Sequence, residues 1–122
     1  MRKIIEGDVN LRSLFLKELF DLSDVEVIDD FDCGKNNLTN LEDSPHTVGK
    51  SFWCFNNDLT NLKGSPHTVG RNFNCSGNNL TSLEGIPKTV GKDFYIRKEL
   101  KNKFPEEYIR SMCKIKGTVV YV

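Results

Sequence analysis

The chain lacks both net charge and long apolar runs. Its 122 residues include 17 basic and 17 acidic side chains, so no overall field attracts nucleic acid or an anionic membrane surface. No apolar stretch approaches the roughly 18 residues that a membrane-spanning helix requires. The N-terminal segment Met1–Glu6 is too short and too charged for a secretory signal. These absences predict a small protein that begins near Met1 and stays in the cytoplasm.

Residues that commonly perform acid or base catalysis near neutral pH are also scarce. His46 and His67 are the only imidazoles in the chain. Each follows a proline on what we expect to be an outer turn, and no nucleophile other than Thr47 and Thr68 recurs beside them. The simpler interpretation of both histidines is that they are solvated turn residues. We therefore predict that the protein is not an enzyme and uses no cofactor.

One 21-residue sequence occurs three times between Phe31 and Asp93. The copies run FDCGKNNLTNLEDSPHTVGKS, FWCFNNDLTNLKGSPHTVGRN and FNCSGNNLTSLEGIPKTVGKD, and a fourth begins at Phe94 and then breaks off. A unit this short cannot bury its apolar positions alone, but stacked units bury them together. The repeat therefore predicts a parallel β solenoid of about four coils over residues 31–97, within a single domain spanning 1–122.

Each repeat contains signals for a strand, an arch and a return leg. Phe-x-Cys alternates apolar with variable residues, as in a strand with one buried face. The proline fixes φ where no ladder donor is needed, and Thr-Val-Gly returns the chain to the next strand. A unit of this length has no room for a full helix. The recurrent asparagines are expected to point inward and satisfy backbone groups of neighbouring coils, and these are Asn36, Asn57 and Asn78.

The repeat also resembles known families. Phe-x-Cys-x-x-Asn-Asn-Leu-Thr-x-Leu-x-Gly-x-Pro-x-x-Val-Gly resembles small repeat proteins encoded by bacteriophages, and its Leu-Thr-Ser-Leu segment with a following Pro is similar to the short leucine-rich repeats of secreted bacterial effectors. Phe replaces the usual first strand Leu, and the resemblance covers about half of the chain. It implies an α+β, leucine-rich-repeat-like fold that acts by binding, and it supplies no catalytic residue.

The N-terminal segment, residues 1–30, is expected to cap the first coil. Within Leu11–Phe20, apolar residues recur with the period of a helix and share one face; they are Leu11, Leu14, Phe15 and Leu19. Val25–Ile28 would add a lead-in coil in which Ile28 takes the place of the repeat valine. The pattern thus predicts a helix that lies across the open first coil.

The C-terminal segment, residues 98–122, is expected to cap the other end. Pro105 opens a second helix, and Gly117 stops it after a lysine-rich last turn. The tail Thr118–Val122 has the composition of a strand, and an unpaired apolar strand is an aggregation hazard. We expect the tail to close the last coil, with pairing to Arg2–Ile5 or to a second chain as the alternatives.

Three cysteines share the second inward strand position of the repeat. Neighbouring rungs lie about 4.8 Å apart, so Cys33, Cys54 and Cys75 would form a line, whereas zinc gathers its ligands around one point at about 2.3 Å. The chain has no CxxC motif. We therefore predict no metal site and a column of buried, reduced thiols.

The strand residues that flank the buried Phe and Cys should point away from the core and form a concave face. Trp53 and Phe55 stand on this face where other repeats carry Asp, Asn, Gly or Ser. Leaving two rings in water forgoes several kcal/mol at about 25 cal/mol per Å², so either the ends of this chain or a partner should cover them. The predicted partner-binding residues are Asp32, Trp53, Phe55, Asn74, Tyr95 and Arg97.

Two functions are compatible with such a face. The first is a non-enzymatic protein-binding module, and the phage resemblance implies a factor that binds or inhibits a host protein in the bacterial cytoplasm. The second is a nucleic-acid-binding regulator that stacks bases on the aromatic residues beside Arg71, Lys92 and Arg97. Arg71 and Lys92 belong to a basic column that also contains Lys50. The balanced charge favours the first function, because a polyanion partner would select for a basic protein.

Overall fold

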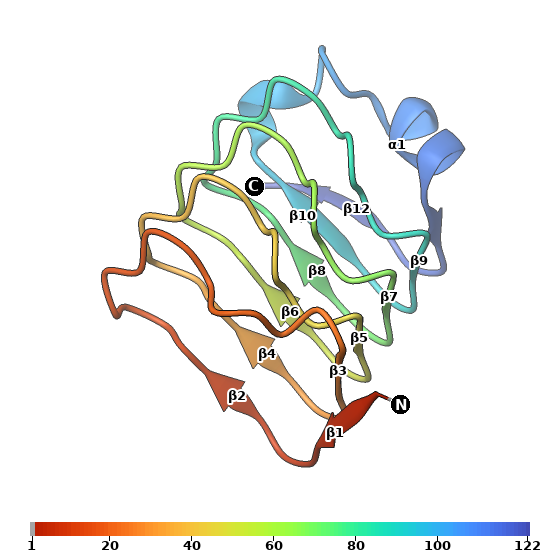
Figure 1. The fold of residues 1–122 in the computed structure, drawn as a ribbon. Helices are drawn as coiled ribbons and strands as arrows, with labels where there is room; N and C mark the ends of the chain where they lie inside the picture. The colour runs from red at the N-terminus through yellow and green to blue at the C-terminus, as the bar shows by residue number, and fades with distance from the viewer. Residues whose placement is uncertain (1) are drawn as a thin grey trace.

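The computed structural model describes residues 2–122 as a parallel β-solenoid of about six coils. Each coil contributes one short strand to each of two six-stranded parallel sheets. Figure 1 shows the strands of one sheet side by side across the molecule, from β2 at one end to β12 at the other. The solenoid prediction is confirmed, but the expected four coils are too few, because both ends of the chain form coils that the repeat does not reveal.

The two sheets run along adjoining sides of the solenoid. Sheet A consists of β1 (Lys3–Ile5), β3 (Val25–Val27), β5 (Thr47–Val48), β7 (Thr68–Val69), β9 (Thr89–Val90) and β11 (Lys114–Ile115). Sheet B consists of β2 (Val9–Asn10), β4 (Phe31–Asp32), β6 (Phe52–Trp53), β8 (Phe73–Asn74), β10 (Phe94–Ile96) and β12 (Val119–Tyr121). Coil one is β1, β2 and the arch that follows, residues 3–24, and later coils are numbered in order.

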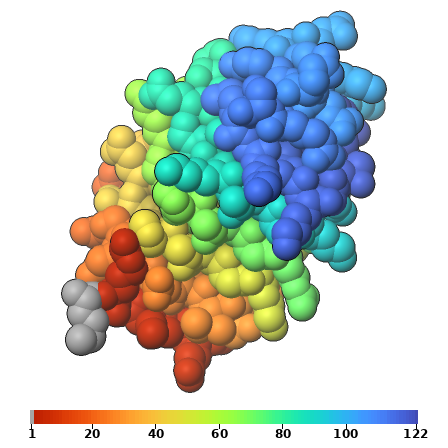
Figure 2. All heavy atoms as spheres, turned by 90° about the vertical axis from the view of Figure 1, so that its right-hand side faces the viewer, coloured from red at the N-terminus to blue at the C-terminus, as the bar shows by residue number. Residues whose placement is uncertain are grey.

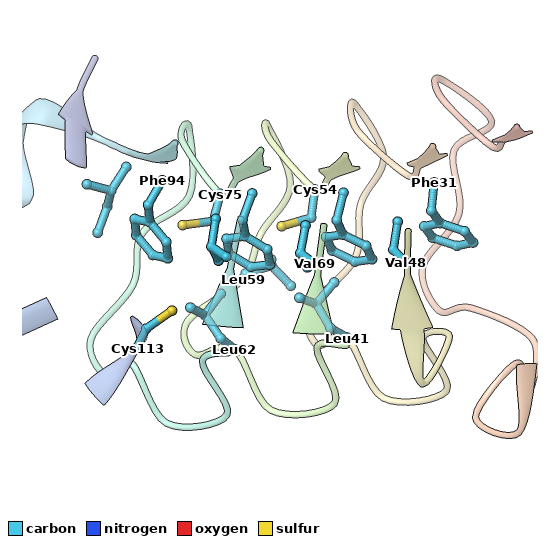
Figure 3. Packing of buried hydrophobic residues seen from close by; sticks show 14 of the residues in the cluster. Phe31, Leu41, Val48, Cys54, Leu59, Leu62, Val69, Cys75, Phe94 and Cys113 are labelled. Carbon is cyan, nitrogen blue, oxygen red and sulfur yellow. The ribbon is translucent and has the colours of Figure 1, made fainter. Parts of the chain in front are cut away.

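The core is built from columns of identical residues, one from each repeat. Phe31, Phe52, Phe73 and Phe94 are fully buried and stack with ring centroids 5.3 to 5.5 Å apart. Leucine, valine and cysteine columns fill the space beside them (Figure 3). Because every internal coil places the same side chain against its neighbour, the packing of one coil interface recurs in the next.

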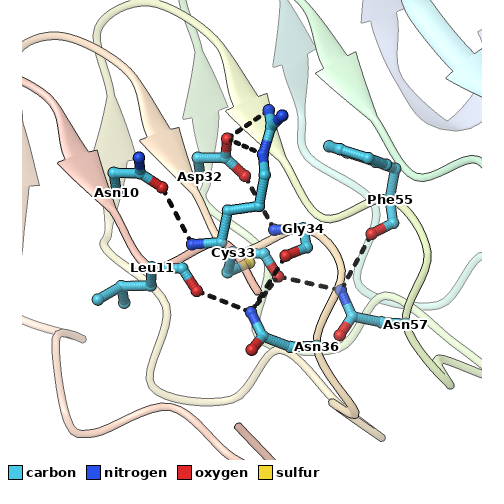
Figure 4. A network of polar contacts seen from close by, with 9 residues as sticks. Asn10, Leu11, Asp32, Cys33, Gly34, Asn36, Phe55 and Asn57 are labelled. Atoms are coloured by element: carbon cyan, nitrogen blue, oxygen red, sulfur yellow. Dashed lines mark hydrogen bonds and ion pairs between the residues drawn. The ribbon is translucent and has the colours of Figure 1, made fainter. Parts of the chain in front are cut away.

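An asparagine ladder holds the arches together, as the sequence predicts. The Asn78 amide donates hydrogen bonds to the carbonyl oxygens of Cys54 and Cys75, each at 3.1 Å. Its oxygen accepts from the backbone N–H groups of Asn57 and Leu59. Asn57 and Asn36 make equivalent bonds to their own neighbours (Figure 4). Each asparagine therefore satisfies buried backbone groups of two coils.

The prediction of an N-terminal helix is wrong. Residues 11–20 contain no helix and form the arch of coil one, which is one residue longer than the repeat. Leu11 donates its N–H to Asp32, and Leu19 is buried, but Phe15 is 85% exposed. Ser13 and Phe15 have φ values of 59° and 58°, which a right-handed helix excludes. Pairing with coil two, rather than local helical periodicity, determines this segment.

The expected position of Ile28 is also wrong. Val27 pairs with Val48 and is 1% exposed, so Val27 occupies the valine column. Ile28 takes the place of the repeat glycine, where its side chain is 48% exposed. A shift of one residue along a strand moves a side chain to the other face of the sheet, which explains the exchange of roles.

The C-terminal segment forms the last arch and the last coil. The 3₁₀ helix η1 (Lys98–Leu100) and the helix α1 (Glu106–Met112) lie between β10 and β11, and α1 buries Ile109. The helix ends before Lys114, which belongs to β11 rather than to a last helical turn. Strand β12 pairs in parallel with β10 of the same chain, so the tail closes the solenoid as expected. Figure 2 shows the C-terminal residues gathered over one end of the stack.

All four cysteines are buried and free of disulfides, which confirms the prediction made for Cys33, Cys54 and Cys75. Burial raises the pKa of the thiols of Cys33, Cys54 and Cys75, and it raises the pKa of Cys113 to about 11. The thiol of Cys54 lies 3.4 Å from the carbonyl oxygen of Asn74 in the next coil. High pKa values and burial keep these groups as unreactive thiols at neutral pH.

We expect Cys54→Ser to lower the free energy of unfolding by about 1 to 3 kcal/mol, because a hydroxyl is more costly to bury than a thiol. Chemical denaturation of the two proteins measures this difference. Native Cys33, Cys54 and Cys75 should also resist a thiol reagent until the protein unfolds. Rapid labelling of the native protein, or stoichiometric metal in protein purified without added metal, would contradict a purely structural role.

Candidate functional site

Four of the six predicted partner-binding residues form one column on the outer side of sheet B. Asp32 pairs with Trp53, Trp53 with Asn74, and Asn74 with Tyr95 in the parallel register. All four side chains are half-buried. Their column crosses β4, β6, β8 and β10, so consecutive side chains lie one strand spacing, about 4.8 Å, apart.

Phe55 joins this column beside Trp53. The two rings meet edge to face, with centroids 6.5 Å apart and an interplanar angle of 81°. The Phe55 ring lies over Gly34 of the preceding coil, and a Cβ atom at Gly34 would overlap the ring (Figure 4). Gly34 is therefore required by close approach of an aromatic ring. Trp53, Phe55 and Asp32 form one contiguous cluster, which we call the aromatic face.

Arg12 belongs to the aromatic face, although we did not predict it. The Arg12 Nε atom donates to a carboxylate oxygen of Asp32 at 2.7 Å, and its guanidinium carbon lies 4.9 Å from the centroid of the Phe55 ring. Arg12 comes from coil one, which the sequence interpretation treated as a helix. Once Val9 is aligned with Phe31, Arg12 falls in the same column as Phe55 and Arg97. The alignment of Val9 with Phe31 was therefore the sequence signal that could have identified Arg12 as part of this face.

Arg97 lies apart from the aromatic face. It sits at the end of β10, two strands away from β6, where its Nε atom donates to Glu99 at 3.0 Å and its Nη1 atom donates to Asn79. Tyr95 stands at the same end of the column. The structure thus divides the predicted residues into the aromatic face at one end and a Tyr95–Arg97 pair at the other, with Asn74 between them.

The column at the start of the sheet B strands is structural. Side chains at this position accept hydrogen bonds from the backbone N–H of the following coil: Asp30 from Ser51, Ser51 from Asn72, Asn72 from Asp93, and Asp93 from Thr118. These side chains tie together the corners between sheets A and B. Each of them already accepts a backbone hydrogen bond within the fold.

The two histidine side chains stack on each other on the outer turn. The rings of His46 and His67 are nearly parallel, with centroids 5.6 Å apart. Burial and the nearby charge of Arg2 lower the pKa of His46, so this imidazole is neutral at pH 7. Their surroundings are turn residues that include Ser44, Pro45 and Ser65.

A shallow groove crosses the outer side of sheet A, and the sequence interpretation did not foresee it. Its floor consists of a threonine column and a glycine column, with Glu26 at one end and Lys114 and Lys116 at the other. The glycines have no room for side chains, because a Cβ atom at Gly70 would overlap the carbonyl oxygen of Gly49. The groove therefore follows from the close stacking of coils.

Residues 2–122 contain neither a cluster of metal-ligating side chains nor a helix that could span a membrane. No three side chains of the His, Cys, Asp or Glu type converge in this part of the chain in a way that could hold a metal ion. Neither of its helices is long and apolar enough to cross a membrane. Comparisons with models of protein families, with curated proteins and with solved structures found no match.

Proposed function

We propose that the protein is a non-enzymatic protein-binding module that uses the aromatic face of sheet B. The observation that supports this proposal is the position of Trp53 and Phe55, which stand half-buried on the outer side of a sheet. Within residues 2–122, neither terminal strand crosses the two rings, and the guanidinium of Arg12 from coil one lies over the Phe55 ring alone. The N-terminal strand β2 continues the sheet beyond β4, and the C-terminal strand β12 continues it beyond β10.

The chemistry of the aromatic face suits a protein partner. Aromatic rings and arginine are the side chains that most often anchor protein interfaces, and here Arg12 and Asp32 form an ion pair directly beside the rings. The side-chain exposures of Arg12 and Asp32 are 42% and 14%, so a partner could bury the rings and leave the pair at the rim. The resemblance to phage repeat proteins favours a host protein as the partner, with inhibition as the consequence.

Nucleic acid is a weaker candidate on the same surface. Of the basic column that would contact phosphates, Lys50 is engaged in an ion pair with Asp29 at 2.8 Å. The aromatic face itself carries one cation and one anion, which offers no net charge to a phosphate backbone. Binding that weakens steeply with added salt would nevertheless identify nucleic acid as the ligand, whereas binding to an aromatic protein interface should change little.

We expect Trp53→Ala to weaken partner binding by about 2 kcal/mol or more, the scale of an interface hot spot, while the melting temperature falls only slightly. The partner is first isolated by affinity capture from the natural host, and the variants are then titrated against it. Phe55→Ala should show a smaller loss, and Tyr95→Ala a smaller one still.

His67→Ala is the matched control, because His67 is exposed on an outer turn away from sheet B. Its affinity and stability should both equal those of the parent protein. If loss of binding in Trp53→Ala tracks loss of stability, the ring is serving the fold rather than an interface. Unchanged binding in both Trp53→Ala and Phe55→Ala would place the interface elsewhere.

A further inference from the structure

The edge of sheet A is covered at the C-terminal end of the solenoid and open at the N-terminal end. At the C-terminal end, Arg110 covers the edge of β11: its Nη1 atom donates to the carbonyl oxygen of Ile115 at 2.8 Å, and its Nη2 atom donates to that of Gly117 at 2.7 Å. At the N-terminal end, β1 has no strand beside its outer edge within residues 2–122. Edge strands left open in this way are available for pairing with another chain.

The open edge of β1 presents the backbone groups of Ile4. In β1, Lys3 donates its N–H to Asp24 and Ile5 accepts from Ile28, so both residues direct their backbone groups toward coil two. Because alternate residues of a strand bond to opposite sides, the N–H and C=O of Ile4 point outward together. In an antiparallel ladder, a residue of a hydrogen-bonded pair uses its N–H and its C=O on the same partner residue. Ile4 is oriented to bond with a second chain in this way.

Coil one also exposes large apolar side chains. Ile4, Leu14, Phe15 and Phe20 are 61%, 53%, 85% and 58% exposed, whereas the equivalent arches of the middle coils keep their apolar residues inside. Phe15 holds a φ of 58°, a conformation that is unfavourable for a bulky residue. Phe15 lies in the arch of this end coil rather than beside β1, and a strained, exposed aromatic residue on the end coil indicates an interaction surface.

We propose that two copies of this chain form a symmetric dimer in which β1 pairs antiparallel with β1 of the second copy, centred on Ile4. A two-fold axis through Ile4 places Arg2 of each copy opposite Glu6 of the other, and Ile4 opposite Ile4. Arg2, Ile4 and Glu6 alternate along the chain and so share one side of the sheet. The register that satisfies the Ile4 backbone thus also creates two opposite-charge pairs and one apolar pair, which are favourable across strands.

The overall charge of coil one permits this contact. Residues 2–24 contain four basic and five acidic side chains, so the two end surfaces carry little net charge when they meet. The contact is isologous and therefore closes at two copies, whereas head-to-tail stacking would require β1 to displace Arg110 from the edge of β11 and would continue without limit. The dimer contact and the aromatic face share no residue, so each can be tested without the other.

The test reverses the charges of Arg2 and Glu6, first singly and then together. Analytical ultracentrifugation over a range of protein concentrations measures the monomer–dimer equilibrium of each variant. The parent chain, with a mass of 13.9 kDa, should sediment as a dimer at high concentration and dissociate on dilution. Arg2→Glu should weaken the dimer at least about tenfold, because it places like charges opposite each other twice. Adding Glu6→Arg to that variant should restore dimerisation to near the parent value.

Two further variants separate the dimer contact from folding. Phe15→Asn places at this position the residue that repeat one carries as Asn37, and asparagine tolerates a positive φ; it should weaken the dimer without lowering the melting temperature of the monomer. Lys88→Glu makes the same charge change on an exposed residue of coil four and should leave the dimer unaffected. A monomeric parent chain, a ladder of larger species, or failure of the double exchange to restore dimerisation would overturn the proposal.

Discussion

Asn78→Ala is expected to destabilise the protein by about 3 to 6 kcal/mol, because two buried N–H groups lose their acceptor at about 1 to 3 kcal/mol each and a small cavity remains. The Asn78 side chain is 1% exposed, and its oxygen accepts from Asn57 and Leu59 at 3.2 and 3.0 Å. Equilibrium unfolding in urea, with circular dichroism as the signal, measures the change.

Asn37→Ala is the control for this prediction. Asn37 occupies the neighbouring position of coil two and is exposed, so its removal should change stability by less than about 0.5 kcal/mol. Asn78→Asp is informative as well, since it keeps the acceptor but removes the two amide donors. Should Asn78→Ala and Asn37→Ala prove equally mild, the ladder would not be a source of stability.

Gly70→Ala should prevent normal stacking of coils three and four. The new methyl group would overlap the carbonyl oxygen of Gly49, which belongs to the rigid backbone of the adjacent coil. The φ angle of Gly70 is not positive, so space rather than backbone conformation makes the glycine necessary. We expect a loss of at least about 3 kcal/mol, the upper range for overpacking, and unfolding at moderate temperature. A thermal melt provides the measurement.

Gly77→Asn is the matched control, because it also replaces a glycine of coil four that lies close to coil three. Gly77 has a φ of 67°, and Asn56 occupies the equivalent position of coil three with a φ of 52°. An added Cβ atom would overlap the Oδ1 atom of the Asn56 side chain, which can move, and would lie 3.1 Å from the Asn56 backbone nitrogen. This variant should lose less than about 1 kcal/mol. Equal losses in the two variants would show that backbone contact between coils is not the deciding factor at Gly70.

The repeat made the middle of the solenoid predictable. Residues that recur at a fixed spacing must occupy equivalent positions in stacked coils, which placed the Phe31, Cys33 and Asn36 columns inside without knowledge of a structure. The same spacing placed Trp53 in register with Asp32 and Asn74. These positions could be predicted because the three copies of the repeat are nearly identical in sequence.

The ends were less predictable because they do not repeat. Leu11, Leu14 and Leu19 are spaced as in a helix, but the same spacing also fits a strand followed by an arch. The segment also contains Leu, Arg, Lys and Glu, all of which favour helices, so composition did not reveal the error. Pairing of Val9 with Phe31 then decided the structure, since tertiary contacts routinely override local propensity.

The candidate site was predicted only in part, because some of its residues lie inside the recognisable repeat and one lies outside it. Trp53 and Phe55 stood out because they break the pattern of small residues on their face. Arg12 lies outside the recognisable repeat, so its contact with Asp32 and Phe55 could be found only after coil one had been aligned with coil two. Arg97 was placed in the correct column, but it lies two strands along that column from Phe55, at the end of β10 rather than β6.

The equality of the middle coils has a consequence for how the chain finds its correct alignment. Coils two, three and four carry the same inward Phe, Cys, Asn and Leu residues, so any one of them could stack on any other with full contacts. The end coils prevent such slippage. Leu14 stands where the others have asparagine, and the last arch contains α1, so every shifted arrangement leaves a mismatched neighbour. Whole repeats could thus be gained or lost between the two ends without altering either of them.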